Sequence, residues 1–331
     1  MVLASHARAS EQLCRPEQLA LPLQTVRISP DREGAAWIKV YSRSISSAVP
    51  TGFSFTREAT ALPPSPSAAI PIICLPGLTR NSRDFHQLAS FLSTSGDFPV
   101  IALDYRGRGN SERDSEKSRY TVAVETGDVI TACAHIAIEK ATFIGTSRGG
   151  LILHHLIDRA PSLIAAAVLN DIGPVIEIGG LLAIRDYLNS NDTPTSWATA
   201  ATYLRTLHGA DFPALSDGDW SEMANAIYRD EDGMPVPDFD PAIALSLRGL
   251  TPETPLPDLW VPFDAMSQIP LMVVRGEHSR LLSEKTVREM RRRHARMADF
   301  TAPGQGHAPL LHLDGPREAI AAFLNDIARS R

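Results

Sequence analysis

The hexapeptide Gly-Thr-Ser-Arg-Gly-Gly at residues 145–150 places Ser147 between an apolar run, residues 141–144, and a second apolar run that follows it. This order predicts a strand, a sharp turn and a helix, the arrangement of a nucleophile elbow. Gly145 and Gly149 let the strand and helix cross closely, while the serine is strained with its hydroxyl above the sheet. Ordinary tight turns share this spacing, so other motifs must distinguish a reactive serine from a structural one.

The size and charge of the chain limit the classes of protein to consider. It has 331 residues, of which 44% are hydrophobic and 21% charged, enough for one large domain with an insertion. Lys and Arg number 32 against 38 Asp and Glu, which gives a formal net charge of -6. Such a chain lacks the basic surface that binds nucleic acid, so we expect no nucleic-acid partner. The sequence makes no prediction about oligomeric state.

The cysteines and the apolar stretches indicate a compartment. Cys14, Cys74 and Cys133 leave at least one thiol unpaired, and the last two lie in apolar segments typical of buried free thiols. No stretch is apolar for long enough to form a signal peptide or to span a bilayer. We therefore expect a cytoplasmic protein with no membrane span.

Strand-like and helix-like segments alternate along most of the chain. This alternation predicts an α/β fold, with a mainly parallel sheet covered by helices on both faces. The expected strands are residues 35–42, 70–75, 99–103, 141–144, 164–169, 271–275 and 297–301. The expected helices of the core are residues 84–94, 120–138, 151–159, 283–294 and 316–328.

The strand pattern disappears between about residues 172 and 266. Helical patches replace it, at residues 181–188, 197–207 and 220–228. A proline-rich return at residues 251–257 favours extended backbone over helix. Three tryptophans fall in or beside this segment, and we interpret them as its own core anchors: Trp197, Trp220 and Trp260.

These patterns predict a core interrupted by a cap. The core comprises residues 35–172 and 267–331, and a helical cap at residues 173–266 is inserted before the last two strands. Residues 1–34 form an N-terminal extension. Its role stays open between an extra strand, a tail and an arm that covers the cap.

Three further motifs accompany the elbow. Residues 74–79 place Pro76 and Gly77 after a strand, residues 104–111 read Asp-Tyr-Arg-Gly-Arg-Gly-Asn-Ser, and residues 304–309 read Gly-Gln-Gly-His-Ala-Pro. With these motifs in this order, the chain from about residue 35 to its C-terminus resembles the α/β-hydrolase family, in its capped serine-nucleophile branch. The resemblance implies an oxyanion-hole loop at the first motif and a catalytic histidine in the last.

The chemistry of these residues is consistent with that resemblance. A serine hydroxyl needs a base within hydrogen-bond reach and donors aimed at the oxyanion formed when it attacks a carbonyl. His307, in the last motif, is the expected base for Ser147. The expected oxyanion-hole donors are the backbone amides of Leu78 and Arg148.

The third member of a catalytic triad is where this chain departs from its family. Relatives carry Arg-Gly-Glu-x-Ser-Asp after the strand that follows the cap. In this chain, Arg280 stands at the position of that aspartate. A guanidinium cannot accept a hydrogen bond from imidazole. Three explanations stay open: Asp171, at the end of the strand before the cap, supplies the acid; Glu277 supplies it instead; or the site lacks an acid and is slow or inactive.

We therefore predict a serine hydrolase that cleaves an ester, a lactone or a similar small carbonyl substrate through an acyl-serine intermediate, without a cofactor or a metal. One alternative is a carbon-carbon bond hydrolase of the aromatic-degradation type. A second is a weak or inactive ligand-binding pseudo-hydrolase, motivated by Arg280. The fold alone does not choose among them.

Four other polar residues receive structural interpretations. Asp104 and Arg106 precede glycines of a turn, where a carboxylate bonds backbone amides and an arginine pairs locally. His154 and His155 are adjacent on the elbow helix, so they diverge by about 100° and do not share a face. We expect them to pack within the fold and to hold no metal.

Overall fold

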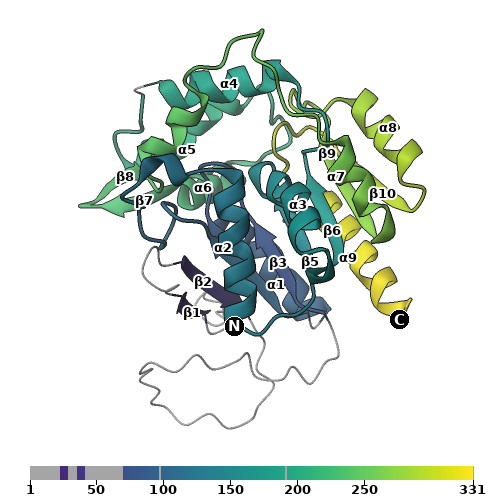
Figure 1. Ribbon diagram of the computed structural model, residues 1–331. Coiled ribbons are helices and arrows are strands. Elements are labelled where there is room, and N and C mark those ends of the chain that lie inside the picture. Colours follow the sequence, from purple (N-terminus) through teal and green to yellow (C-terminus); the bar gives the residue numbers. More distant parts are fainter. Residues whose placement is uncertain (1–22, 29–35, 42–69, 97, 191, 331) are drawn as a thin grey trace, which may run out of the picture.

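The computed structural model describes the backbone of residues 23–28 and 36–41, and residues 70–96, 98–190 and 192–330 in full. An eight-stranded sheet runs through the core in the order β1-β2-β4-β3-β5-β6-β9-β10 (Figure 1). Its six strands from β4 to β10 in that order pair in parallel, and β2 is antiparallel to both β1 and β4. The strands are β1 Leu23–Ile28, β2 Ala36–Tyr41, β3 Ile72–Leu75, β4 Val100–Asp104, β5 Ala141–Thr146, β6 Ile164–Asn170, β9 Leu271–Gly276 and β10 Met297–Ala302.

Helices cover both faces of this sheet, as predicted. Those that pack on the sheet are α1 His86–Ser95, α2 Val122–His135, α3 Arg148–Arg159, α7 Trp260–Ala265, α8 Glu284–Arg293 and α9 Asp314–Arg329. Three more helices lie in the inserted segment, residues 173–266: α4 Ile178–Asn189, α5 Trp197–His208 and α6 Asp217–Ile227. Short 3-10 helices lie between them, at Ser82–Phe85, Lys117–Arg119, Pro161–Leu163, Pro241–Leu247 and Met266–Gln268. The fold is therefore the expected α/β sandwich of three layers.

Strand residues alternate between two hydrophobic clusters. Ile73 and Leu75 of β3 pack in a cluster with α2, α3, α7 and α8, whereas Ile72 and Cys74 pack on the opposite face with α1 and α9. All four of these residues are fully buried, as parallel strands between two helical layers require. Burying a side chain of this size stabilises the fold by about 1.5–3 kcal/mol. Cys74, like Cys133 of α2, is a free thiol.

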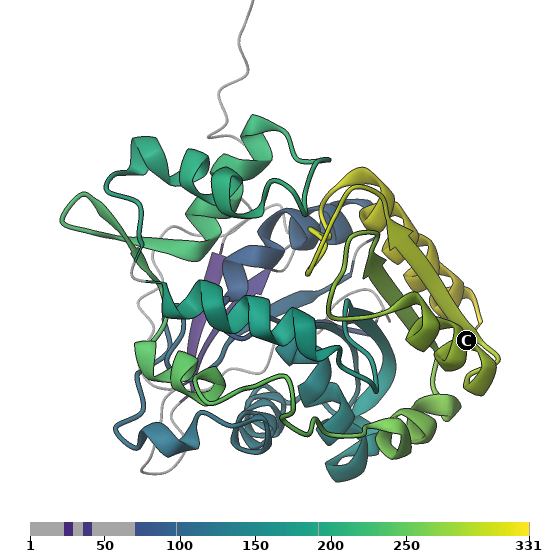
Figure 2. The same cartoon turned by 90° about the horizontal axis from the view of Figure 1, so that it is seen from above.

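Residues 173–266 fold over one end of the sheet, with α4 crossing above it (Figures 1 and 2). This inserted segment has a small core of its own, in which Trp220 is 2% exposed, as expected of an anchor. Trp260 differs, because it packs against Phe263 and the main core. The return at residues 251–259 is not helical, as its prolines predicted.

The inserted segment is not wholly helical, which corrects the sequence prediction. A two-stranded hairpin follows α6, formed by β7 Tyr228–Glu231 and β8 Met234–Pro237. Its turn is Asp232-Gly233, with φ of 54° and 81° at the two positions. An Asp-Gly pair readily adopts such positive φ angles and is a strong hairpin signal. The turn was missed because the flanking strands are only four residues long.

Contacts with the loops at the carboxyl ends of the strands fix the inserted segment in place. The amide of Ala214 donates to the carbonyl of Gly304 at 3.1 Å, in the loop after β10. The Arg83 side chain donates to the carbonyl of Tyr228 at 3.1 Å, from the loop after β3. The amide of Asp240 donates to the carbonyl of Gly107 at 2.7 Å, after β4. The segment therefore lies against the edge at which parallel α/β sheets place their ligand sites.

The N-terminal extension includes an extra strand. β1 lies within residues 1–34 and pairs antiparallel with β2, the strand expected at residues 35–42. Residues 1–22, 29–35 and 42–69 lie outside the described part of the chain, and so does Cys14. None of the described helices is long and apolar enough to cross a membrane.

Candidate active site

Ser147 lies in a sharp turn between β5 and α3. Its φ of 49° and ψ of -107° are unusual for a residue with a side chain. The turn is held because the Ser147 amide donates to the carbonyl of Asn170 at 2.9 Å. A Cβ atom on Gly149 would lie 2.2 Å from the carbonyl oxygen of Leu75, so only glycine lets α3 cross the end of β3 this closely. The elbow geometry predicted from the sequence is therefore present.

His307 lies beside this serine, in the loop after β10. Its Nε2 atom is 2.9 Å from Ser147 Oγ, and its Nδ1 atom is 2.8 Å from Oδ2 of Asp171. A carboxylate accepts hydrogen bonds, so Nδ1 carries the proton and the lone pair of Nε2 accepts from the serine hydroxyl. The histidine side chain is 15% exposed, whereas that of Asp171 is fully buried.

The side chain of Asn170 holds the histidine loop against the sheet, and that of Gln305 supports the loop from within. Asn170, the last residue of β6, donates from Nδ2 to the carbonyl of Pro309 at 3.0 Å and to Thr146 Oγ1 at 3.1 Å. Within the loop, Gln305 Oε1 accepts from the amide of Leu310 at 2.8 Å. Asn170 therefore links the strand before the elbow to the loop that carries the histidine.

Asp171 follows β6 directly, with a φ of 55° and a fully buried side chain. Oδ1 accepts from the amide of Gly276 at 2.8 Å, while Oδ2 faces His307. Because β6 and β9 are neighbours in the sheet, the end of β6 lies beside the end of β9, the strand after which the family motif places its acid. Of the carboxylates that the sequence left open, Asp171 is the one at the histidine.

Glu277 and Arg280 both lie elsewhere. Glu277 Oε2 accepts from the amide of Gly304 at 2.7 Å, and its side chain is 54% exposed. Arg280 donates to Oδ2 of Asp211 in the inserted segment at 2.7 Å. The arginine at the position of the family acid therefore contacts the inserted segment and leaves the histidine to Asp171.

The two expected oxyanion-hole residues come from the start of α3 and from the loop after β3. Arg148 is the first residue of α3 and follows Ser147 directly, and Leu78 lies in the loop after β3, whose end packs against Gly149. The carbonyl of Leu78 accepts a hydrogen bond from Nε of Arg108 at 2.8 Å.

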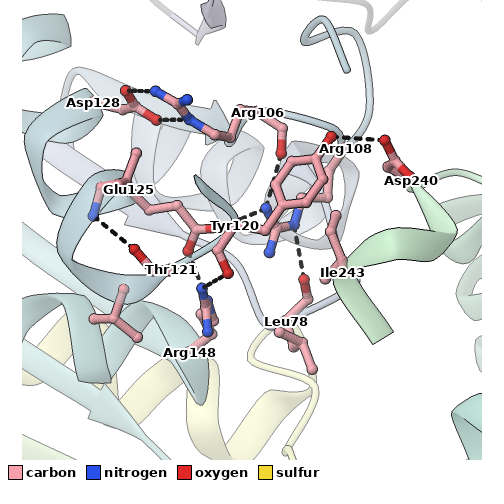
Figure 3. Close-up of polar contacts among 12 residues, drawn as sticks. Leu78, Arg106, Arg108, Tyr120, Thr121, Glu125, Asp128, Arg148, Asp240 and Ile243 are labelled. Atoms are coloured by element: carbon pink, nitrogen blue, oxygen red, sulfur yellow. Dashed lines mark hydrogen bonds and ion pairs between the residues drawn. The ribbon is translucent and has the colours of Figure 1, made fainter. Parts of the chain in front are cut away.

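A buried carboxylate that the sequence analysis did not single out lies between the two arginines (Figure 3). Glu125, in the first turn of α2, receives Nη1 of Arg108 on Oε1 at 2.7 Å and Nε of Arg148 on Oε2 at 2.6 Å. Burial lowers the pKa of Arg108, and the Glu125 carboxylate acts in the opposite direction. The sequence signal was an acidic residue on a helix face that otherwise faces the core, in register with Val129 and Ala132.

The structural interpretations of the turn after β4 are confirmed. Asp104 accepts from the amides of Ser82 and Asn110 at 2.7 and 3.0 Å. Arg106 forms a two-pronged contact with Asp128, at 2.7 and 2.6 Å. Both side chains therefore stabilise the loop.

Within the residues that the structure describes, no group of three or more His, Cys, Asp or Glu side chains comes together to hold a metal ion. His154 is fully buried, with Nδ1 2.7 Å from the carbonyl of Gly150. It packs inside the fold, as expected.

Known proteins resemble this chain in sequence and in fold. A family model described as alpha/beta hydrolase fold matches residues 70–312. A 3-hydroxybutyrate-oligomer hydrolase from Cupriavidus necator is 34% identical over 257 residues, which cover 76% of this chain and 86% of that protein. A 2-(acetamidomethylene)succinate hydrolase from Mesorhizobium japonicum is 26% identical over 233 residues, or 70% and 79% of the two chains.

Solved structures agree with these sequence matches. The crystal structure of an alpha/beta hydrolase from Novosphingobium aromaticivorans has a TM-score of 0.78 and 32% identity to this chain, covering 92% of this chain and 98% of that one. The family model, the similar relatives and the strand order together show that this chain belongs to the α/β-hydrolase family.

Proposed function

We propose that the protein is a serine hydrolase that cleaves carboxylic esters through an acyl-serine intermediate. Ser147 is the nucleophile, His307 the general base and acid, and Asp171 the residue that orients the histidine. The observation that carries the proposal is the single imidazole within 2.9 Å of the serine hydroxyl and 2.8 Å of a buried carboxylate. A serine, a base and an orienting group in this order form an activated nucleophile.

In the first half of the reaction, His307 Nε2 takes the proton of Ser147 as Oγ attacks the ester carbonyl. The amides of Leu78 and Arg148 donate to the oxyanion of the tetrahedral intermediate, and each such donor is worth about 3 kcal/mol in the transition state. The carbon-oxygen bond to the alcohol then breaks, and His307 gives the proton to the departing alkoxide. The acyl group remains on Ser147.

In the second half, a water molecule attacks the acyl-serine, and His307 accepts a proton from that water. Collapse of the second tetrahedral intermediate breaks the bond to Oγ, and the histidine returns its proton to Ser147. Asp171 accepts the hydrogen bond of Nδ1 and stabilises the imidazolium that forms in both halves. No cofactor enters these steps.

We further propose that residues 173–266 act as a cap that shapes the substrate site, and that the substrate is a short ester of a hydroxy acid. The inserted segment contacts the loops that carry the candidate residues, through Ala214 on Gly304 and Asp211 on Arg280. The similar Cupriavidus necator protein is named as a hydrolase of 3-hydroxybutyrate oligomers, which are oligoesters. The identity of 34% across most of both chains supports the same bond type here.

The pseudo-hydrolase alternative rested on Arg280. Because Asp171 contacts His307 while Arg280 pairs with Asp211, an arginine at that position does not deprive the histidine of a carboxylate. The carbon-carbon hydrolase alternative requires turnover of a diketone or a dienoate, and turnover of simple esters alone would exclude it.

The test uses purified full-length protein and its Ser147→Ala variant, with p-nitrophenyl butyrate and the linear dimer of 3-hydroxybutyrate as substrates. We expect wild-type protein to release p-nitrophenol and to split the dimer into two hydroxy acids, and Ser147→Ala to do neither. Turnover of the p-nitrophenyl ester alone would overturn the hydroxy-acid substrate and retain the esterase. Absence of Ser147-dependent turnover of both esters would overturn the proposed function.

A further inference from the structure

The Glu125 carboxylate is enclosed by the core and shared by two arginines. Its side chain and that of Arg108 are both 0% exposed, and that of Arg148 is 11% exposed. Each carboxylate oxygen takes one guanidinium, at 2.7 Å for Arg108 and 2.6 Å for Arg148. Buried from solvent, such charge-assisted bonds hold their partners in a narrow range of geometry.

Each arginine leads to one of the two amides that we assign to the oxyanion hole. Arg148 supplies one amide itself, and its side chain is further held by a hydrogen bond from Nη2 to the carbonyl of Tyr120 at 3.2 Å. Arg108 donates from Nε to the carbonyl of Leu78 at 2.8 Å. The carbonyl and the amide of one residue are joined through a single Cα, so fixing the Leu78 carbonyl restricts the direction of the Leu78 amide.

The two amides come from segments far apart in the chain, the loop after β3 and the start of α3. Their relative position fixes the shape of the oxyanion hole, and catalysis depends on donors held at the correct distance before the charge develops. A single group bonded to both sides restricts that position. Glu125 is such a group, and Figure 3 shows it between Arg108 and Arg148.

Helix α2 carries a second carboxylate that binds an arginine, and this pair does not lead to either oxyanion-hole amide. Asp128, one turn after Glu125, binds Arg106 through both carboxylate oxygens at 2.6 and 2.7 Å. That pair anchors the turn after β4 to α2. A substitution of Asp128 therefore tests the anchoring of the loop, and a substitution of Glu125 tests the alignment of the oxyanion hole.

We infer that Glu125 is a positioning residue that aligns the Leu78 and Arg148 amides of the oxyanion hole through Arg108 and Arg148. This inference rests on the proposed function. It assigns Glu125 no contact with the substrate. Its expected effect is on the transition state, because the oxyanion exists there and is absent from the bound ester.

The experiment compares Glu125→Gln and Arg108→Met with the matched control Asp128→Asn. The readouts are kcat and KM for p-nitrophenyl butyrate, the inhibition constant of a trifluoromethyl ketone, and the unfolding midpoint. The serine oxygen adds to the carbonyl of such a ketone and forms a tetrahedral oxyanion. Arg108→Met leaves Glu125 and Arg148 as a balanced pair, so it tests the link to Leu78 even where Glu125→Gln fails to fold.

We expect both site variants to lower kcat by about 10- to 100-fold with little change in KM, less than the loss of a whole donor. The ketone should bind more weakly by the same factor as kcat/KM falls, and Asp128→Asn should keep wild-type kcat. Equal kcat and ketone affinity across Arg108→Met, Asp128→Asn and wild type would overturn the inference and leave the proposed function intact. Wild-type protein without Ser147-dependent turnover would overturn both.

Discussion

His307 Nδ1 lies 2.8 Å from Oδ2 of Asp171, a residue 136 positions earlier in the chain. The partner carboxylate comes from the end of β6, whereas the family motif locates its acid after β9, where this chain has Arg280. Neighbouring parallel strands bring the two ends side by side, so a carboxylate at either position can reach the same imidazole. The acid can therefore move from the end of β9 to the end of β6 and keep its contact with the histidine.

Asp171→Asn should lower kcat for p-nitrophenyl butyrate by about 10³- to 10⁴-fold, because an amide nitrogen facing Nδ1 favours the tautomer that cannot accept the serine proton. Glu277→Gln is the matched control. Its amide oxygen can still accept from the Gly304 amide, so its kcat should stay within about twofold of wild type. Steady-state kinetics of both variants checks this, and the reverse ranking would assign the acid to Glu277.

Arg280→Asp should not increase activity. The new carboxylate would replace the partner of Asp211 with a like charge, and Asp171 already accepts from Nδ1 of the histidine. An exposed ion pair is worth about 1 kcal/mol or less, so we expect kcat/KM to fall by no more than about fivefold. A large rate gain in this variant would indicate a site that is impaired for want of an acid there.

Gly149→Ala should destabilise the fold by about 2–3 kcal/mol and abolish activity, because its Cβ would lie 2.2 Å from the Leu75 carbonyl oxygen. Gly179 is also the second residue of its helix, and no atom lies within 4 Å of the position that a Cβ would take there. Gly179→Ala should therefore leave stability unchanged or raise it by about 0.5–1 kcal/mol. Urea unfolding of the two variants measures the difference, and equal effects would contradict the tight elbow.

Acid should destabilise the protein in part through His154. Burial lowers the pKa of His154 to about 4. Its Nδ1 donates a hydrogen bond to the carbonyl of Gly150. Nε2 then bears the lone pair and has no partner. Since the unfolded chain binds a proton near pH 6.5 and the folded one near pH 4, stability is complete above about pH 6.5 and falls below it.

The loss assigned to His154 between about pH 7 and pH 4 is about 3 kcal/mol. His154→Leu should reduce the pH dependence of the free energy of unfolding by that amount. A His154→Leu variant with the wild-type pH dependence would show that His154 is protonated equally in both states.

Much of this fold could be predicted from the sequence because local patterns determine it. The apolar runs before Pro76 and before Ser147 are buried strands, and the glycines around Ser147 are required by the crossing of β5 and α3. The Asp232-Gly233 hairpin was missed despite a local signal, since its strands are short and lie in a segment of helical patches.

The long-range parts of the site could not be read from local patterns. Asp171 was one of three open explanations, because only the pairing of β6 with β9 shows which strand end meets the histidine loop. Glu125 gave a weaker signal still. Its partners Arg108 and Arg148 come from the turn after β4 and from the start of α3, and nothing in their spacing along the chain indicates that they share one carboxylate.

The most direct test of the account is the rate and position of labelling by a fluorophosphonate, which loses fluoride as an activated serine oxygen bonds to phosphorus. Peptide mass spectrometry should find one adduct, on Ser147, in wild-type protein and none in Ser147→Ala. The labelling rate should fall by orders of magnitude in Asp171→Asn and stay near wild type in Glu277→Gln. Absence of the adduct from Ser147 in wild-type protein, or equal labelling rates in wild type and Asp171→Asn, would contradict it.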